Sequence, residues 1–133
     1  MPVNIMIGLL ALLVALVCYS IGVWGAFRKK AVARKHLVLL WVGFAFDVLA
    51  TAMMAMQIGG LDLRPGGPLL HTVLALVAMF GMAAAAGVGT YAIANRQEAL
   101  SASVTRWVLA PWVIWVGVFV WGMIGRGAAR IGG

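Results

Sequence analysis

Asp47 is the acidic side chain of this 133-residue sequence that lies inside a long apolar segment, and it is the first candidate for chemistry. A carboxylate in apolar surroundings must be hydrogen-bonded, protonated or paired with a ligand, because its charge is poorly solvated there. Three roles follow: binding of a ligand or cofactor, proton transfer, or a structural hydrogen bond. The structural partner would be Tyr19, Ser20 or Thr51, since Tyr19 and Ser20 fall at a similar depth in the preceding segment.

Helical spacing extends this candidate site in both directions. His36, Gly43 and Asp47 fall on one face of a helix, because offsets of 7 and 11 residues return near the same angle. Trp115 and the glycine- and alanine-rich stretch 81–89 fall in a similar layer of the later segments. Small residues recur there every four positions, at Gly81, Ala85, Gly89 and at Ala83, Gly87, which favours close helix packing or a slot for a flat ligand.

The two histidines, His36 and His71, are candidate metal or haem-iron ligands, since imidazole is the commonest metal ligand in proteins. His36 opens the second apolar segment and His71 opens the third, so they belong at opposite ends of a bundle. About 30 Å of bilayer would separate them, and one chain could not place both on the same metal. In the alternative interpretation, His36 is an interfacial cation beside Lys35, and His71 is a polar residue facing water.

Other reactive side chains give weaker signals. Met53 and Met56 have a spacing suited to Cu(I), but methionine is also common in apolar packing. Cys18 is the single cysteine, which excludes an intramolecular disulfide and indicates a packing role. The sequence has no phosphate loop, HExxH motif, nucleophile elbow or carboxylate pair. We therefore expect a protein that is not an enzyme.

The amino-acid composition indicates the environment that surrounds these residues. The sequence is 65% hydrophobic and 10% charged, against about 45–50% and 25% in soluble domains. A chain of this length cannot bury so much apolar surface, so the excess must face lipid. Cytosolic enzymes, secreted disulfide modules and disordered tails are excluded. The net charge of +7 lies in short links between apolar runs, so nucleic acid is not an expected partner.

Four apolar runs are long enough to cross a bilayer, since about 20 residues span it as a helix. No run alternates with period two, which excludes a transmembrane barrel, and the first run is expected to be a retained helix rather than a signal peptide. The links are short, so neighbours are antiparallel. We predict an all-α, integral membrane, up-down four-helix bundle forming one transmembrane domain over 1–133. The expected helices are 5–27, 37–58, 69–94 and 107–124.

The lysines and arginines in the links predict how the protein is oriented in the membrane. Of the ten lysines and arginines, five lie in 28–36 and two in 95–106. Because cytoplasmic links are enriched in positive charge, these two links should be inside and both termini outside. The link 95–106 is predicted to be polar and irregular, with Ser101, Ser103 or Thr105 capping the fourth helix.

Short motifs along the chain resemble those of the HsmA-like family of small four-helix, haem-associated bacterial membrane proteins. They are 19–24 (YSIGVW), His36-Leu37 with 41–44 (WVGF) and Asp47, His71, and 112–115 (WVIW) with Gly122-Met123. The resemblance implies a bacterial cytoplasmic (inner) membrane protein that binds haem or a related tetrapyrrole as a sensor or buffer. It offers His36, Asp47 and His71 as cofactor-binding residues, with His36 and His71 as metal ligands.

One position departs from the family pattern, in which a second histidine lies deep in the third helix. This chain has the alanine-glycine run near Ala85 there, so it would supply at most one histidine per iron. Of the two candidates we favour His36, which faces inward beside that run. Arg34, Lys35 and Arg106 lie on the same side and could pair with haem propionates.

Two further functions stay open beside haem binding. A non-catalytic accessory subunit would pack its small-residue stripes and tryptophans against partner helices, in a larger complex or a homo-oligomer. A small proton-coupled exporter would match the length and number of spans. The exporter ranks last, because such transporters depend on an acid in the first helix and this chain has none there.

Overall fold

The computed structural model describes residues 3–132, and the side chains of all of these except 4, 57, 58 and 125–132. Every regular element in this part of the chain is a helix, and four stretches are long and apolar enough to cross a membrane. The predicted all-α, four-helix membrane fold is therefore confirmed. The helices are α1 (Val3–Lys29), α2 (Arg34–Ile58), α3 (Gly67–Ala94), α4 (Glu98–Trp107) and α5 (Leu109–Gly132).

The fourth span differs from the prediction, because it begins at Glu98 and is built from α4 and α5 in succession. The chain turns at Val108 between them, and the nearby Pro111 explains the break, since proline has no N–H to continue the helical ladder. The segment expected to be irregular is thus mostly helical. Its polar composition concealed a helix that buries one face and exposes the other.

The predicted capping roles in this segment are wrong, because the three candidate residues lie inside α4. Ser101 is buried, and its Oγ accepts a hydrogen bond of 2.9 Å from the backbone N–H of Val32 in the α1–α2 link. The hydroxyl of Thr105 donates to the carbonyl oxygen of Ala102 at 2.7 Å. Ser101 therefore ties α4 to the α1–α2 link rather than starting a helix.

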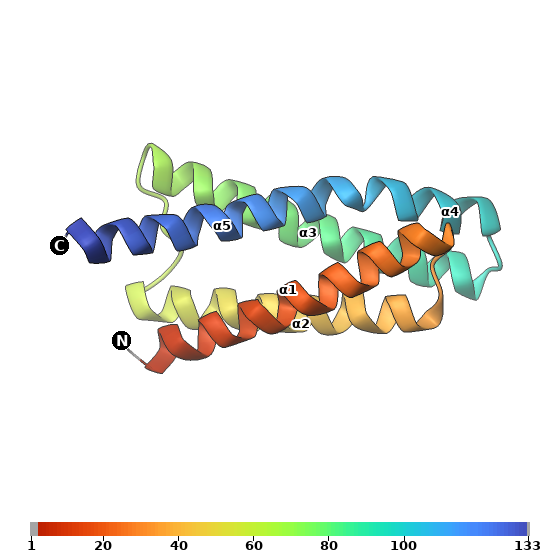
Figure 1. Cartoon of the computed structure of the whole chain (residues 1–133), viewed down its shortest axis with the longest axis horizontal. Helices are drawn as coiled ribbons and strands as arrows, with labels where there is room; N and C mark the ends of the chain where they lie inside the picture. The colour runs from red at the N-terminus through yellow and green to blue at the C-terminus, as the bar shows by residue number, and fades with distance from the viewer. Residues whose placement is uncertain (1–2, 133) are drawn as a thin grey trace.

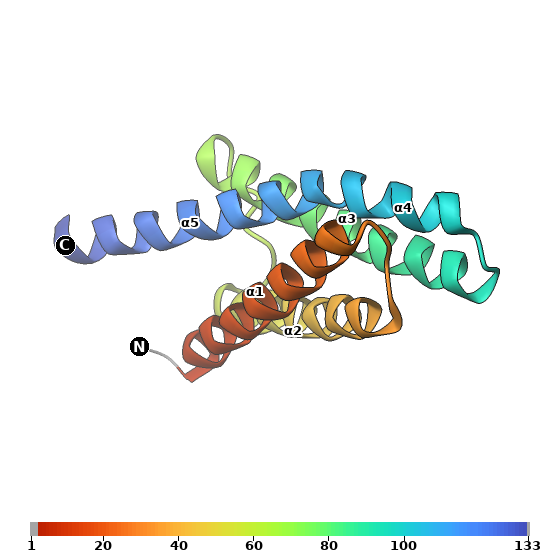
Figure 2. The same ribbon diagram turned by 45° about the vertical axis from the view of Figure 1, so that its right-hand side comes forward.

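The helices form two hairpins, α1 with α2 and α3 with α4–α5 (Figure 1). Links 30–33 and 95–97 lie together at one end, which we call the basic end. The α2–α3 link (59–66) lies at the other, which we call the open end. Figure 2 shows the α1–α2 hairpin diverging from α5 toward the open end. The packing between hairpins is thus different at the two ends.

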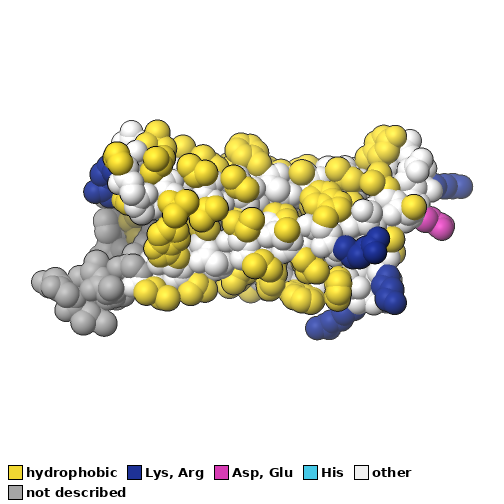
Figure 3. Space-filling model, turned by 90° about the horizontal axis from the view of Figure 1, so that it is seen from above, with side chains coloured by type: hydrophobic (Ala, Val, Ile, Leu, Met, Phe, Trp, Pro, Cys, Tyr) yellow, Lys and Arg dark blue, Asp and Glu magenta, His cyan; other side chains and the backbone are white. Residues whose placement is uncertain are grey.

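Lipid-facing surface dominates the middle of the molecule. Within an 18-residue apolar stretch of each candidate span, between 22% and 33% of the residues are buried. Figure 3 shows hydrophobic side chains covering the sides of the bundle, with lysines and arginines at the ends. Most of the coloured cations in that view lie at the basic end. This distribution is the one expected for a multi-pass membrane protein in contact with the bilayer.

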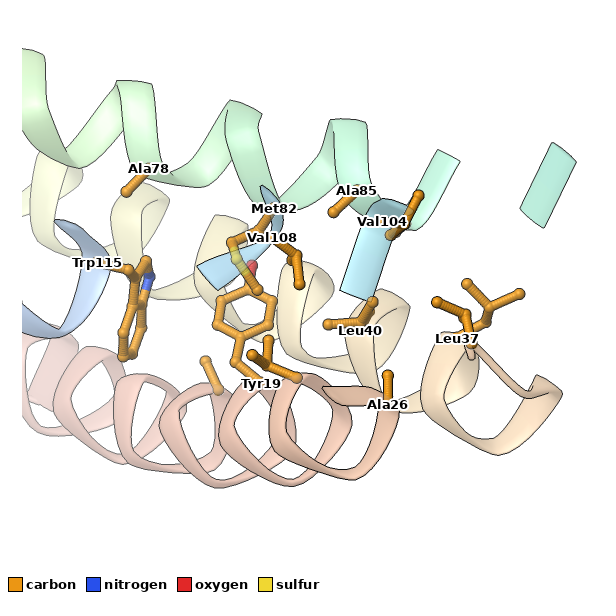
Figure 4. Packing of buried hydrophobic residues seen from close by; sticks show 14 residues of the cluster. Tyr19, Ala26, Leu37, Leu40, Ala78, Met82, Ala85, Val104, Val108 and Trp115 are labelled. Carbon is orange, nitrogen blue, oxygen red and sulfur yellow. The ribbon is translucent and has the colours of Figure 1, made fainter. Parts of the chain in front are cut away.

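Side chains from both hairpins form the core (Figure 4). The core extends into the basic half of the bundle. Small residues of α3 allow the close approach that their spacing predicts. A Cβ on Gly81 would lie 2.6 Å from Cβ of Pro111, and one on Gly89 would lie 2.7 Å from a methyl of Leu37. Ala85 between them is fully buried, whereas Gly87 has no neighbour within 4 Å of a Cβ. One of the two predicted small-residue stripes is therefore a packing face.

Candidate ligand cavity around Asp47

Asp47 sits where α1, α2 and α5 meet, and its side chain is 4% exposed. The Tyr19 hydroxyl donates to Oδ2 of Asp47 at 3.1 Å, and the Trp115 indole Nε1–H donates to the same oxygen at 2.9 Å. The predicted contact of Asp47 with helix one is confirmed, and Tyr19 is the partner. Thr51 donates instead to the backbone carbonyl of Asp47 at 2.9 Å. Ser20 accepts from Trp112 at 3.2 Å.

Packing fixes the two donors around the carboxylate. The ring of Tyr19 lies across Gly43, where an added Cβ would be 2.7 Å from Cδ1 of the ring. The rings of Tyr19 and Trp115 meet edge to face, with centroids 5.4 Å apart, and Figure 4 shows both rings directed into the interior. Asp47 Oδ2 is thus held by side chains whose positions are set by close packing.

The second carboxylate oxygen of Asp47, Oδ1, differs from Oδ2 in its hydrogen bonding. Asp47 Oδ1 accepts no hydrogen bond from the described residues. Within that part of the chain, every side-chain nitrogen or oxygen that is fully buried has a partner. Oδ1 is therefore not completely buried, and Asp47 lines a cavity between the two hairpins.

This cavity has a volume of about 310 Å³ and lies in the open half of the bundle. Its walls come from α1, α2, α3 and α5, and it reaches the α2–α3 link at Gly60–Asp62. Most of its lining is apolar. The polar side chains along it are Asp47, Thr51, Asp62, His71 and Thr72.

His71 lies on the wall of this cavity, in the first turns of α3. Its Nε2 is 3.3 Å from the carbonyl oxygen of Val118, and its ring meets Trp121 edge to face at 5.3 Å. Val118 follows Trp115 by three residues on α5, or about 4.5 Å along the axis. Asp47 and His71 thus contact the same short stretch of α5 and line one site.

His36 is separated from that site. It is 3% exposed, and its Nδ1 accepts the backbone N–H of Ala33 at 3.0 Å. Its ring lies against α1, where a Cβ on Gly25 would be 2.9 Å from Nε2. His36 does share the α1-facing side of α2 with Gly43 and Asp47, as predicted. It stabilises the start of α2 at the basic end rather than acting as an exposed cation.

The residues at the open end form a polar rim. Asp62 and Arg64 make an ion pair with an N–O distance of 2.7 Å, and hydrogen bonds from Arg64 lower the pKa of Asp62 below its usual range. The Thr72 hydroxyl donates to the carbonyl oxygen of Asp62 at 2.7 Å, which attaches the link to α3. The acidic charge at the rim is therefore already compensated by Arg64, whereas Asp47 has neutral hydrogen-bond donors, Tyr19 and Trp115.

No family model matches the chain, and neither the curated proteins nor the solved structures contain a match. The candidate site consequently stands on its own geometry. Among the described residues, no three or more histidine, cysteine, aspartate or glutamate side chains are grouped so that they could hold a metal ion. The predicted site residues divide into one pair that shares a cavity, Asp47 and His71, and one that does not, His36.

Proposed function

We propose that this membrane protein binds a small, largely apolar molecule in the cavity between its hairpins. The observation that carries the proposal is the accessible Oδ1 of Asp47 in that otherwise mostly apolar space. Ligand sites in proteins typically have about 300–1,000 Å³, apolar walls and a few convergent polar groups. The volume of about 310 Å³ lies at the small end of this range and suits a ligand with a single ring.

Filling the cavity tests this function. Ala75 lines it from α3, so Ala75→Trp should occupy the space that the ligand needs. Ala84 is exposed on the same helix, and Ala84→Trp is the matched control. We expect 2-(4-fluorophenyl)ethanol to give a saturable bound ¹⁹F NMR signal with wild-type protein in lipid nanodiscs. Ala75→Trp should abolish the signal and Ala84→Trp should keep it, while an unchanged signal in Ala75→Trp would contradict binding in this cavity.

The orientation proposed for this function places the basic end in the cytoplasm of a bacterial cell and the open end outside. The support is the concentration of lysine and arginine around links 28–36 and 95–106. The cavity would then open toward the external face. In a Cys18→Ala background, cysteines placed in 28–35 should resist membrane-impermeant reagents in intact cells, and one at Gly60 should react. The reverse pattern would overturn the orientation.

Haem binding is a second candidate, and its structural support is a histidine on the cavity wall. His71 lines the cavity together with Met54 and Met123, and histidine and methionine both serve as axial haem ligands. The fit is partial, since a porphyrin with its propionates is larger than this cavity and the hairpins would have to separate. The geometry favours His71 over His36, and the cations Arg34, Lys35 and Arg106 lie at the other end.

A haem titration in detergent distinguishes the two histidines. We expect His71→Ala to remove the Soret shift of bound haem and His36→Ala to leave it in place, because His36 does not line the cavity. Loss of the shift in His36→Ala alone would reverse the ligand choice. A wild-type protein without any Soret shift would exclude haem and leave the small-ligand function unaffected.

A further inference from the structure

We infer that the ligand of the cavity is a small lipophilic amine, bound as its ammonium ion to Oδ1 of Asp47. This inference rests on the proposed binding function and adds the chemical class of the ligand. It follows from the acidic side chain, which has no lysine or arginine beside it among the described residues, from the apolar and aromatic walls, and from the position of Oδ1 of Asp47.

Within the part of the chain that the structure describes, Asp47 has no lysine or arginine beside it in the cavity. Both donors to Oδ2, Tyr19 and Trp115, are neutral, and no lysine or arginine is among the described residues lining the space. The other titratable groups there are Asp62, which is paired with Arg64, and His71, which lies against the carbonyl of Val118. A buried carboxylate without an opposite charge is costly, so a cationic ligand would supply what the protein does not.

The walls suit the rest of such a molecule. Trp115 and Phe119 stack with ring centroids 5.7 Å apart and an angle of 11° between planes, and both line the cavity. Aromatic faces attract cations as well as apolar groups. Leu9, Leu12 and Leu76 add aliphatic surface on the other sides. The site thus offers one charged point and an apolar enclosure, which matches a single ring on a short aminoalkyl chain.

A bare metal ion fits the same space poorly. Calcium takes six to eight oxygen ligands, and magnesium demands near-ideal octahedral coordination. Here Oδ1 of Asp47 accepts no hydrogen bond from the described residues, but these residues offer no group of three or more histidine, cysteine, aspartate or glutamate side chains for a metal ion. An ammonium group needs far less, because a single charge-assisted hydrogen bond to Oδ1 can fix it and the apolar body fills the remaining volume.

The position of Oδ1 also favours binding of an amine. Two hydrogen bonds to Oδ2 from different helices hold the carboxylate, so Oδ1 keeps its direction without a ligand present. A charged acceptor that is already oriented loses little conformational freedom on binding. Tyr19 and Trp115 are accordingly positioning residues, whereas Asp47 would touch the ligand.

Three probes with the same fluorinated ring separate charge from shape: 2-(4-fluorophenyl)ethylamine, 2-(4-fluorophenyl)ethanol and 3-(4-fluorophenyl)propionate. Their affinities would be measured at pH 7 by ¹⁹F NMR titration of the full chain in nanodiscs of zwitterionic lipid, with empty nanodiscs as background. We expect the amine to bind at least about tenfold more tightly than the alcohol, as a charge-assisted bond should provide. The propionate should not bind.

Substitutions then test whether Asp47 causes the preference for the amine over the alcohol. Asp47→Asn should reduce affinity for the amine by about tenfold or more and change that for the alcohol little, because it removes charge and keeps shape. Glu98→Gln is the matched control, because Glu98 is exposed at the basic end and does not line the cavity, so it should leave both affinities unchanged. Tyr19→Phe keeps the acid of Asp47 but removes one of the two bonds that orient it, so it should lower the affinity for the amine less than Asp47→Asn does.

The outcomes distinguish this inference from the function on which it rests. Equal affinities for amine and alcohol in the wild type, or tighter binding of the propionate, would overturn the amine inference while cavity binding stands. That comparison needs no variant, so it holds even if Asp47→Asn fails to fold. Binding of none of the three probes would instead contradict the proposed function itself.

Discussion

Replacing Asp47 by leucine is expected to lower the free energy of unfolding by about 2–6 kcal/mol, because two buried donors lose their acceptor and each costs about 1–3 kcal/mol. Those donors are the Tyr19 hydroxyl and the Trp115 indole N–H, which both bond to Oδ2. Asp62→Leu is the comparison, since Asp62 pairs with the exposed Arg64 at the rim, and its effect should be small. Unfolding by SDS in mixed micelles, followed by tryptophan fluorescence, measures both.

A second background tests the physical reason for this loss. In a Tyr19→Phe/Trp115→Phe double variant the donors are absent, so Asp47→Leu should cost much less there than in the wild type. The difference between the two backgrounds reports the coupling of the three side chains. An equal loss in both backgrounds would show that the hydrogen bonds to Oδ2 do not carry the effect.

Much of this arrangement was predictable from the sequence because the membrane imposes strong constraints. An acid inside an apolar run must find a partner, and helical phase with rough depth placed Tyr19 and Trp115 near Asp47. Helical periodicity also predicted that His36, Gly43 and Asp47 lie on one face of the same helix. Length and composition alone gave the four spans and the all-α fold.

The cavity was not predictable in the same way. It arises because the two hairpins pack tightly near the basic end and diverge toward the open end (Figure 2). That divergence depends on the sizes of many side chains at once, such as Pro111 resting on Gly81. No periodic pattern encodes it. Asp47 and His71 are therefore recognisable in the sequence as separate candidates, but no pattern in it indicates that they line one cavity.

The role of His36 illustrates a second limit. Its position at the third residue of α2 allows Nδ1 to accept the N–H of Ala33, a local bond that satisfies a free group at the helix start. A histidine near a basic link has the same appearance in sequence whether it faces water, binds iron or caps a helix. The polar segment 98–107 was misjudged for a related reason, since its buried residues Ser101 and Thr105 resemble those of a loop.

Gly43 is the position where the smallest substitution should disturb the site most. A Cβ there would lie 2.7 Å from Cδ1 and 2.9 Å from Cε1 of Tyr19, and the contact is with the body of an aromatic ring rather than with a flexible end. Gly43→Ala should therefore force the ring away from α2, at about 1–3 kcal/mol for overpacking. The displaced hydroxyl would leave Asp47 Oδ2 with Trp115 as its donor.

Gly87→Ala is the matched control for that substitution, because a Cβ on Gly87 meets nothing within 4 Å. Its effect should be neutral or slightly stabilising, since alanine is the better helix former. SDS unfolding gives the stability of both variants, and near-ultraviolet circular dichroism reports the Tyr19–Trp115 contact, which should change in Gly43→Ala alone. Equal stabilities and spectra for the two variants would mean that Tyr19 can leave Gly43 freely. In that case the carboxylate would not be held in advance of ligand binding, and the orientation of Oδ1 would no longer support recognition of an ammonium group.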